Sequence, residues 1–248
     1  MAHNNRRTAF FTKNTEAIAN YYLNLFPVEE VVRLLSLHCS LPFREIASSY
    51  TLRFNSVANA EDLRAFCLDT PLRLDVGAAY DIANGTHPMS ECQPVGREFT
   101  IDYDFTDFCE YCDAATKKVC PLCWETTLVP LIKKTQQVIS LLTSKFVIFC
   151  SGGKGFHVWI FDPYLFFYTD EERKQLVEAI KQELGFEIDE EVSVNVKHTI
   201  RLPFSLNEQF LCAPLDLKDV SYLNSFFSLE QLNEQLIQKL VQRTKHIQ

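Results

Sequence analysis

Hydrophobic and polar positions follow two different periods along this chain. Between residues 15 and 26, Ile18, Tyr22, Leu25 and Phe26 recur at the three- and four-residue spacing of a helix. Pro27 breaks this pattern, and a second amphipathic helix is predicted over 28–38. The same spacing predicts further helices over 61–67, 125–145, 170–184 and 228–246. Alternating or continuous apolar runs predict strands over 50–54, 72–79, 146–150, 157–162 and 187–196.

The clearest strand pattern covers residues 99–105. Its two faces differ in character, with Phe99, Ile101, Tyr103 and Phe105 on one and Thr100, Asp102 and Asp104 on the other. No internal repeat or linker separates the predicted helices and strands. We therefore expect one α/β (mixed α+β) domain that spans residues 1–248.

The composition excludes several classes of protein. The 248 residues carry 32 acidic and 24 basic side chains, and this net charge of −8 argues against a basic protein that coats nucleic acid. No run approaches the ~20 apolar residues that a membrane span needs. The N-terminal Met-Ala-His-Asn-Asn-Arg-Arg also lacks the apolar stretch of a secretory signal. We therefore expect an intracellular protein without membrane association, whose acidic excess remains compatible with metal-binding carboxylates.

Nine cysteines are an odd number for a disulfide framework, and the lack of a secretory signal favours reduced thiols. Five are scattered and are interpreted as small buried hydrophobes: Cys39, Cys67, Cys92, Cys150 and Cys212. The other four form two Cys-x-x-Cys pairs: Cys109, Cys112, Cys120 and Cys123. Four thiolates within 109–123 predict an embedded, structural, tetrahedral Zn²⁺ site. The alternatives are four unligated thiols, or His157 in place of one sulfur.

Asp102 and Asp104 are the most informative polar pair. Residues i and i+2 of a strand point to the same side, so both carboxylates face one spot. Two such groups repel each other unless a cation or a proton joins them, and hard divalent cations prefer oxygen ligands. The pair therefore predicts a site for one or two Mg²⁺ or Mn²⁺ ions, and a solvent-facing strand is the alternative. Asp189 could complete a carboxylate triad, although its neighbouring glutamates equally suggest a solvated acidic patch.

A glycine-rich segment, Ser-Gly-Gly-Lys-Gly-Phe-His, covers residues 151–157. Glycines let the backbone approach a ligand, and Lys154 and His157 add a charge and a donor. The order differs from a Walker A loop, and a strand follows where that motif has a helix. The segment predicts a phosphate-binding turn, with an ordinary hairpin turn as the alternative. Arg53, Arg73 and Arg201 lie at strand-like positions and could pair with phosphates, or be ordinary surface charges.

In combination, these segments resemble the catalytic (small) subunit of the archaeal and eukaryotic DNA primases. Asp-Tyr-Asp-Phe-Thr-Asp at 102–107 resembles the D-x-D-x-T-D strand of that family. Cys-Pro-Leu-Cys-Trp at 120–124 resembles half of its zinc knuckle, and 151–159 its S-G-x-x-G-x-H-x-W hairpin. Segments 43–45, 73–79 and 197–205 also agree, and all six occur in the family's order.

This resemblance implies a primase (prim-pol) catalytic core with a small zinc motif at its side and without the large helical insertion of bigger relatives. It implies that Asp102, Asp104 and Asp189 bind two Mg²⁺ or Mn²⁺ ions, and that Glu45 is a further catalytic carboxylate. It also implies nucleotide contacts from a larger set: Arg53, Arg73, Ser151, Lys154, Gly155, His157, His198 and Arg201. The chain departs from the family at Gly153, where members often carry Arg, and in the spacing of its first zinc knuckle.

The function that the resemblance implies is synthesis of short RNA primers from NTPs on single-stranded DNA during replication. The implied partners are a primase large subunit, in a heterodimer, and a replicative polymerase complex. The implied location is the nucleus in a eukaryote and the cytoplasm otherwise. Two alternatives are a prim-pol-fold repair or damage-bypass polymerase that extends DNA, and a non-catalytic, zinc-stabilised nucleic-acid-binding subunit. The net charge predicts weak template binding by the isolated chain.

Overall fold

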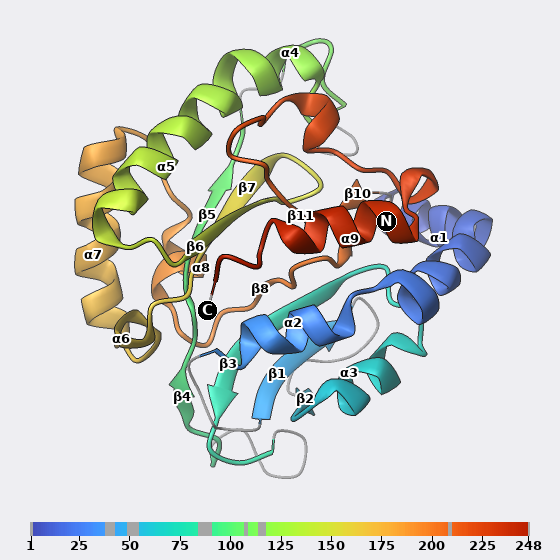
Figure 1. Ribbon diagram of the computed structural model, residues 1–248, viewed down its shortest axis with the longest axis horizontal. Helices are drawn as coiled ribbons and strands as arrows, with labels where there is room; N and C mark the ends of the chain where they lie inside the picture. Colours follow the sequence, from blue (N-terminus) through green and yellow to red (C-terminus); the bar gives the residue numbers. More distant parts are fainter. Residues whose placement is uncertain are drawn as a thin grey trace.

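The computed structural model of the chain describes residues 2–37, 43–48, 55–83, 91–106, 109–113, 118–207 and 210–247. The strand predicted over 50–54 lies outside this part of the chain, as do Cys39 and Arg53. Two antiparallel sheets, flanked by helices, form the described structure (Figure 1).

The first sheet has the order β2-β1-β3-β4, and β8 also pairs with β3. Its strands are β1 (Phe43–Ser48), β2 (Asn55–Val57), β3 (Leu74–Tyr80), β4 (Pro94–Gly96) and β8 (Ile200–Arg201). The second sheet has the order β11-β6-β7-β5. Its strands are β5 (Phe99–Asp104), β6 (Phe146–Cys150), β7 (Gly155–Ile160) and β11 (Ala213–Pro214). A separate two-stranded hairpin joins β9 (Leu206–Asn207) to β10 (Phe210–Leu211).

Helices from both ends of the chain pack into the core that contains residues of the first sheet: α1 (Ala2–Asn20), α2 (Val28–Leu35), α3 (Ala60–Cys67) and α9 (Glu234–Gln242). Helices α5 (Val129–Leu142) and α7 (Asp170–Leu184) lie side by side along the second sheet (Figure 1). Three short helices complete this half: α4 (Pro121–Cys123), α6 (Pro163–Phe166) and α8 (Glu190–Val194). None of the helices in the described residues is long and apolar enough to cross a membrane.

The second sheet is buried on both faces, and its two faces pack in different cores. Phe149, Trp159 and Phe161 pack in one core with the first sheet and its helices. Ile148, Phe156 and Val158 pack in a second core with α5 and α7. His157 alternates with the second group and therefore faces the first sheet, as do its strand neighbours on β5. Polar groups of both sheets can meet only on these facing surfaces.

Several predicted elements are confirmed. Helix α7 and strand β6 coincide with the predicted ranges 170–184 and 146–150. The helix predicted over 125–145 instead begins as a π-helical turn, Trp124–Leu128, before α5, which carries Pro130 in its first turn. The helix predicted over 228–246 is divided into a 3₁₀ turn, Leu229–Gln231, and α9. Asn233 separates these two because its side chain accepts the Leu236 N–H as a helix cap.

The strand predicted over 187–196 is wrong. Asp189 is the N-cap of α8, and its Oδ1 accepts the Val192 N–H at 3.2 Å. The apolar alternation here reflects a short helix with one buried side, because local capping outweighs a weak period-2 pattern. The chain between α7 and this cap is only 185–188, with Gly185 in a left-handed conformation. Helices α7 and α8 are therefore joined by a short connection.

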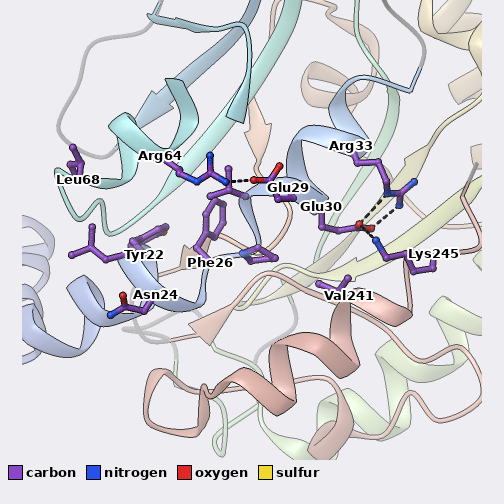
Figure 2. Close-up of a pocket in the computed structure, with 13 residues that line it drawn as sticks. Tyr22, Asn24, Phe26, Glu29, Glu30, Arg33, Arg64, Leu68, Val241 and Lys245 are labelled. Carbon is purple, nitrogen blue, oxygen red and sulfur yellow. Dashed lines mark hydrogen bonds and ion pairs between the residues drawn. The ribbon is translucent and has the colours of Figure 1, made fainter. Parts of the chain in front are cut away.

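Glu30 joins α2 to the C-terminal end of the chain, at the edge of a groove of about 640 Å³ (Figure 2). Its buried carboxylate accepts hydrogen bonds from Arg33 at 2.7 and 3.0 Å, and from Lys245 and Thr244. Burial alone would raise the pKa of Glu30, but these hydrogen bonds outweigh it and lower the pKa from 4.5 to about 2.

We expect acid to destabilise the fold through Glu30. Because its pKa is lowered in the folded state, its ionised form contributes stability that is complete above about pH 4.5 and lost as the pH falls toward 2. This difference corresponds to about 3 kcal/mol. In urea denaturation, Glu30→Gln should unfold more easily at pH 7 and lose less stability between pH 5 and 3 than the parent. Glu29→Gln, which removes an exposed pair with Arg64, is the control, and equal acid sensitivity in Glu30→Gln contradicts the prediction.

Candidate active site and zinc site

The two β5 carboxylates lie opposite the end of the glycine-rich turn. In the β5–β7 register, Asp102 pairs with His157 and Asp104 with Gly155. His157 Nε2 lies 3.4 Å from Asp102 Oδ1, an approach without hydrogen-bond geometry. Lys154 Nζ lies 2.6 Å from Asp104 Oδ2. Two motifs about 50 residues apart, each found from sequence, are thus brought together by one strand pair.

The 151–155 turn is closed by its own backbone. The Ser151 N–H donates to the Gly155 carbonyl at 3.0 Å, and the Gly155 N–H donates to Ser151 Oγ at 3.2 Å. Gly152 has a φ of 71°, and a Cβ at Gly155 would overlap the Tyr103 carbonyl of β5. The hairpin itself therefore requires two of these glycines, whatever ligand the turn holds.

The first sheet adds a charged group that faces the turn. On β3, Asp75 pairs in register with Arg201 of β8, and Arg201 Nε lies 3.5 Å from Asp75 Oδ1. Arg73 Nε donates to both carboxylate oxygens of Asp75, at 2.6 and 2.8 Å. Arg201 Nη1 also donates to the Ser151 carbonyl at 3.5 Å. The sequence did not single out Asp75 as a site residue. Its position two residues after Arg73 on a predicted strand puts both side chains on one face, and this spacing could have identified it.

Asp75→Asn is expected to leave Arg73 and Arg201 without their shared counter-charge. Both Asp75 and Arg201 are largely buried, so the free energy of unfolding should fall by about 3 kcal/mol. Millimolar inorganic pyrophosphate should then raise the melting temperature of the variant more than that of the parent, because it can neutralise the two guanidinium groups. Asp69→Asn, on an exposed turn, is the control. An equal pyrophosphate effect in variant and parent would show that Asp75 does not organise the arginines.

Burial and like charges perturb the site. Burial, followed by the nearby Asp104 and Asp189, raises the pKa of Asp102 from 3.8 to about 7. Burial, followed by Arg201 and Arg73, lowers the pKa of His157 from 6.5 to about 3. The imidazole is therefore neutral at pH 7, and it can donate only one hydrogen bond.

The carboxylates fit divalent cations. Asp102 Oδ1 is buried and has no hydrogen-bond partner among the described residues. Asp189 is tied to the same strand, because its N–H donates to the Asp102 carbonyl at 2.9 Å. A cation would relieve the repulsion that raises the pKa of Asp102 and would satisfy its free oxygen. The carboxylates of Asp102, Asp104 and Asp189 lie further apart than the sulfurs of the four clustered cysteines. The Asp189 side chain also caps α8.

Three other residues of the predicted site do not belong to the groups described so far. Glu45 is fully buried on β1, where it accepts a hydrogen bond from the Tyr80 hydroxyl at 3.4 Å and lies so close to Gly77 that a Cβ there would clash with its carboxylate. His198 is half-buried, with Nδ1 2.8 Å from the Thr199 carbonyl. The third residue, Arg53, lies outside the described residues.

The four clustered cysteines converge. Their sulfurs all lie within 4.8 Å of one another, and Cys109 Sγ lies 3.4 Å from that of Cys123, 3.6 Å from that of Cys120 and 3.8 Å from that of Cys112. A backbone hydrogen bond near Tyr111 is the largest effect that lowers the pKa of Cys109 to about 7. Burial and the Cys109 sulfur raise the pKa of Cys123 to about 12.

This donor set fits Zn²⁺, which would hold all four sulfurs as thiolates in a closed tetrahedral site. His157, the alternative ligand, instead faces Asp102 across the β5–β7 pair. Within the described residues, no other group of three or more metal-ligating side chains gathers as tightly.

Comparison with known proteins agrees with this geometry. No family model matches the chain. It is 26% identical over 193 residues to the DNA primase small subunit of Schizosaccharomyces pombe, a match that covers 69% of this chain and 41% of that protein. It is 25% identical over 177 residues to the DNA primase small subunit of Saccharomyces cerevisiae, a match that covers 64% of this chain and 42% of that protein. The chain is related to the DNA primase small subunits. It spans about two fifths of the length of these curated relatives.

The fold of the chain is also similar to that of a solved structure. The polymerase domain of Mycobacterium tuberculosis ligase D, solved in complex with DNA, matches with a TM-score of 0.54 at 12% identity, over 90% of this chain and 89% of that one. The resemblance to primase small subunits and the mixed α/β prim-pol core are therefore confirmed. The single-domain prediction and the roles of individual residues in this primase relative stay predictions.

Proposed function

We propose that this chain is a DNA-directed RNA polymerase that makes short RNA primers on single-stranded DNA by two-metal nucleotidyl transfer. The observation that carries the proposal is the pair of carboxylates on β5, which lies opposite the end of the glycine-rich turn. Arg201 of the Arg73–Asp75–Arg201 group contacts the same turn. The relation to primase small subunits and the prim-pol core support this reaction class.

In this proposal, Asp102, Asp104 and Asp189 hold two Mg²⁺ or Mn²⁺ ions. When bound, the ions supply the charge that activates the primer 3′-hydroxyl and neutralises the triphosphate and the departing pyrophosphate. Lys154, Arg73 and Arg201 supply three positive charges for the triphosphate. Neutral His157 and Ser151 contribute hydrogen bonds, and Gly155 lets the turn lie directly against β5.

The remaining site residues extend the proposal. Glu45 would be a further carboxylate of the site, positioned by Gly77 and Tyr80. His198 and Arg53 would contact the nucleotide, as the resemblance implies. The Zn²⁺ site is structural in this scheme, because four thiolates leave no open position for water.

The proposal includes partners and a location. A primase large subunit would form a heterodimer with the chain and would supply much of the grip on template DNA, because a net charge of −8 disfavours tight DNA binding by this chain alone. A replicative polymerase complex would receive the primer. In a eukaryote, the site of action would be the nucleus.

The test is primer synthesis without a primer. The chain is incubated with a single-stranded DNA template, Mg²⁺ or Mn²⁺, and either NTPs or dNTPs, and the products are separated by length. RNA products of a few nucleotides, lost in Asp104→Ala, are expected. Products formed only by extending a supplied primer with dNTPs would favour the repair or bypass polymerase. The non-catalytic subunit would be favoured if the chain binds nucleic acid but neither incorporates nucleotides nor binds NTP in a metal-dependent way.

A further inference from the structure

The zinc loop, residues 109–113 and 118–123, holds one lysine in a fixed position. Asp113 and Lys118 form a two-way backbone bridge, with each N–H donating to the other's carbonyl at 3.0 Å. Asp113 directly follows Cys112, and Lys118 lies two residues before Cys120. Any group that holds the two cysteine pairs together therefore also fixes the backbone from which the Lys118 side chain extends.

Lys118 reaches an aromatic cluster formed by Phe210, Tyr222 and Phe226. Its Nζ lies 4.0 Å from the ring centroid of Phe210 and 5.8 Å from that of Tyr222, within the range of a cation–π interaction. Trp124, directly after Cys123, packs edge-on against Phe226 at 4.8 Å. The second cysteine pair is thus preceded by Lys118 and followed by Trp124, and both of these residues contact the cluster.

The aromatic cluster continues into the hairpin that supports the glycine-rich turn. Phe210 is on β10, in register with Asn207 of β9. Asn207 Nδ2 donates to the Ser151 carbonyl at 3.4 Å. A Cβ on Gly152 would lie only 3.0 Å from the Phe210 carbonyl and 3.1 Å from the Leu211 carbonyl, so the β10 backbone lies directly against the turn.

We infer that the zinc loop positions the 151–155 turn for its ligand, and that Lys118 on the Phe210 ring is the contact that joins them. Lys118 is a positioning residue, which acts through Phe210 and Asn207 and does not touch the nucleotide. The inference rests on the proposed function in one respect, the assignment of the turn's ligand as a nucleoside triphosphate. The mechanical link itself depends only on the contacts above.

The test compares Lys118→Met, which keeps the aliphatic length and removes the cation, with Lys118→Arg, which restores a cation. Lys133→Met, on an exposed position of α5, is the matched control. In Lys118→Met, the dissociation constant and the KM for NTP should rise about three- to tenfold with little change in kcat. Zinc content should stay at one ion per chain. The amides of Ser151 and Gly155 should exchange hydrogen faster, and Lys118→Arg should restore the parental values.

A double variant separates this link from independent effects. Lys118→Met combined with Phe210→Leu should be no worse in NTP affinity than Phe210→Leu alone, because both changes break the same contact. Additive losses, unchanged amide exchange at Ser151 and Gly155, or loss of zinc in Lys118→Met would each overturn the inference. If the parent protein binds no NTP, the proposed function fails, whereas the amide exchange still decides whether the zinc loop positions the turn.

Discussion

Asp102→Asn is expected to lower nucleotidyl transfer by about 10²- to 10³-fold while the chain stays folded. The change preserves the shape of the side chain and removes one of the two charges that β5 presents beside Lys154 and His157. Because Asp102 Oδ1 has no hydrogen-bond partner in the described residues, the substitution breaks no hydrogen bond of that atom. The loss should fall on kcat with either Mg²⁺ or Mn²⁺, measured by primer synthesis under saturating NTP.

The same variant should be at least as stable as the metal-free parent at pH 8. The pKa of Asp102 is raised to about 7 in the folded state, above its ordinary 3.8. Its contribution to stability is therefore fully present below about pH 4 and is lost as the pH rises through 7, where the buried group must ionise. An asparagine never ionises, so the variant avoids this loss. Added Mg²⁺ or Mn²⁺ should raise the melting temperature of the parent and leave that of Asp102→Asn nearly unchanged.

The control for both measurements is Asp69→Asn, which removes an equal charge from an exposed turn. It should keep parental activity and parental stabilisation by metal. Asp102→Asn with normal primer synthesis, or with undiminished stabilisation by metal, would remove this carboxylate from the metal site.

Local patterns predicted the parts of the site that depend on one element. The alternation in 99–105 placed Asp102 and Asp104 on one face, and in the register of β5 with β7 they lie opposite His157 and Gly155. The spacing of the cysteines predicted their convergence, which the structure shows in full. In these cases, the side chains that meet are close in sequence or belong to a strand whose period is unambiguous.

Other parts depend on packing between distant segments, which no local period encodes. Strand β1 was not predicted from its pattern, because Arg44 and Glu45 are polar and yet buried. Arg44 is neutralised by a bidentate pair with Glu98, at 2.6 and 3.0 Å, more than 50 residues away. Asp75 gains its role only when β8 pairs with β3 and brings Arg201 beside it. Asp189 was assigned to the wrong element, yet its backbone still binds the β5 strand that carries Asp102.

Cys109→Ser is expected to remove zinc as completely as Cys120→Ser. The spacing of the first cysteine pair differs from that of the family, but Cys109 Sγ lies within 3.8 Å of each of the three other sulfurs. A structural zinc site contributes folding free energy directly, so its loss should lower the melting temperature by about 10 °C. Zinc is measured by atomic spectroscopy after gel filtration, and unfolding by calorimetry with and without a chelator. The parent should fall to the melting temperature of the variant when the chelator is added, and the variant should not respond.

The control for this prediction is Cys67→Ala, a buried cysteine in the core between α3 and the N-terminal helices. It should be destabilised by the lost side chain while retaining one zinc ion and its sensitivity to chelator. The two variants thus separate loss of metal from loss of packing, which melting temperature alone cannot do. If Cys109→Ser retains one zinc ion per chain, three cysteines and another ligand form the site, and the convergence of the four sulfurs does not reflect metal binding by Cys109.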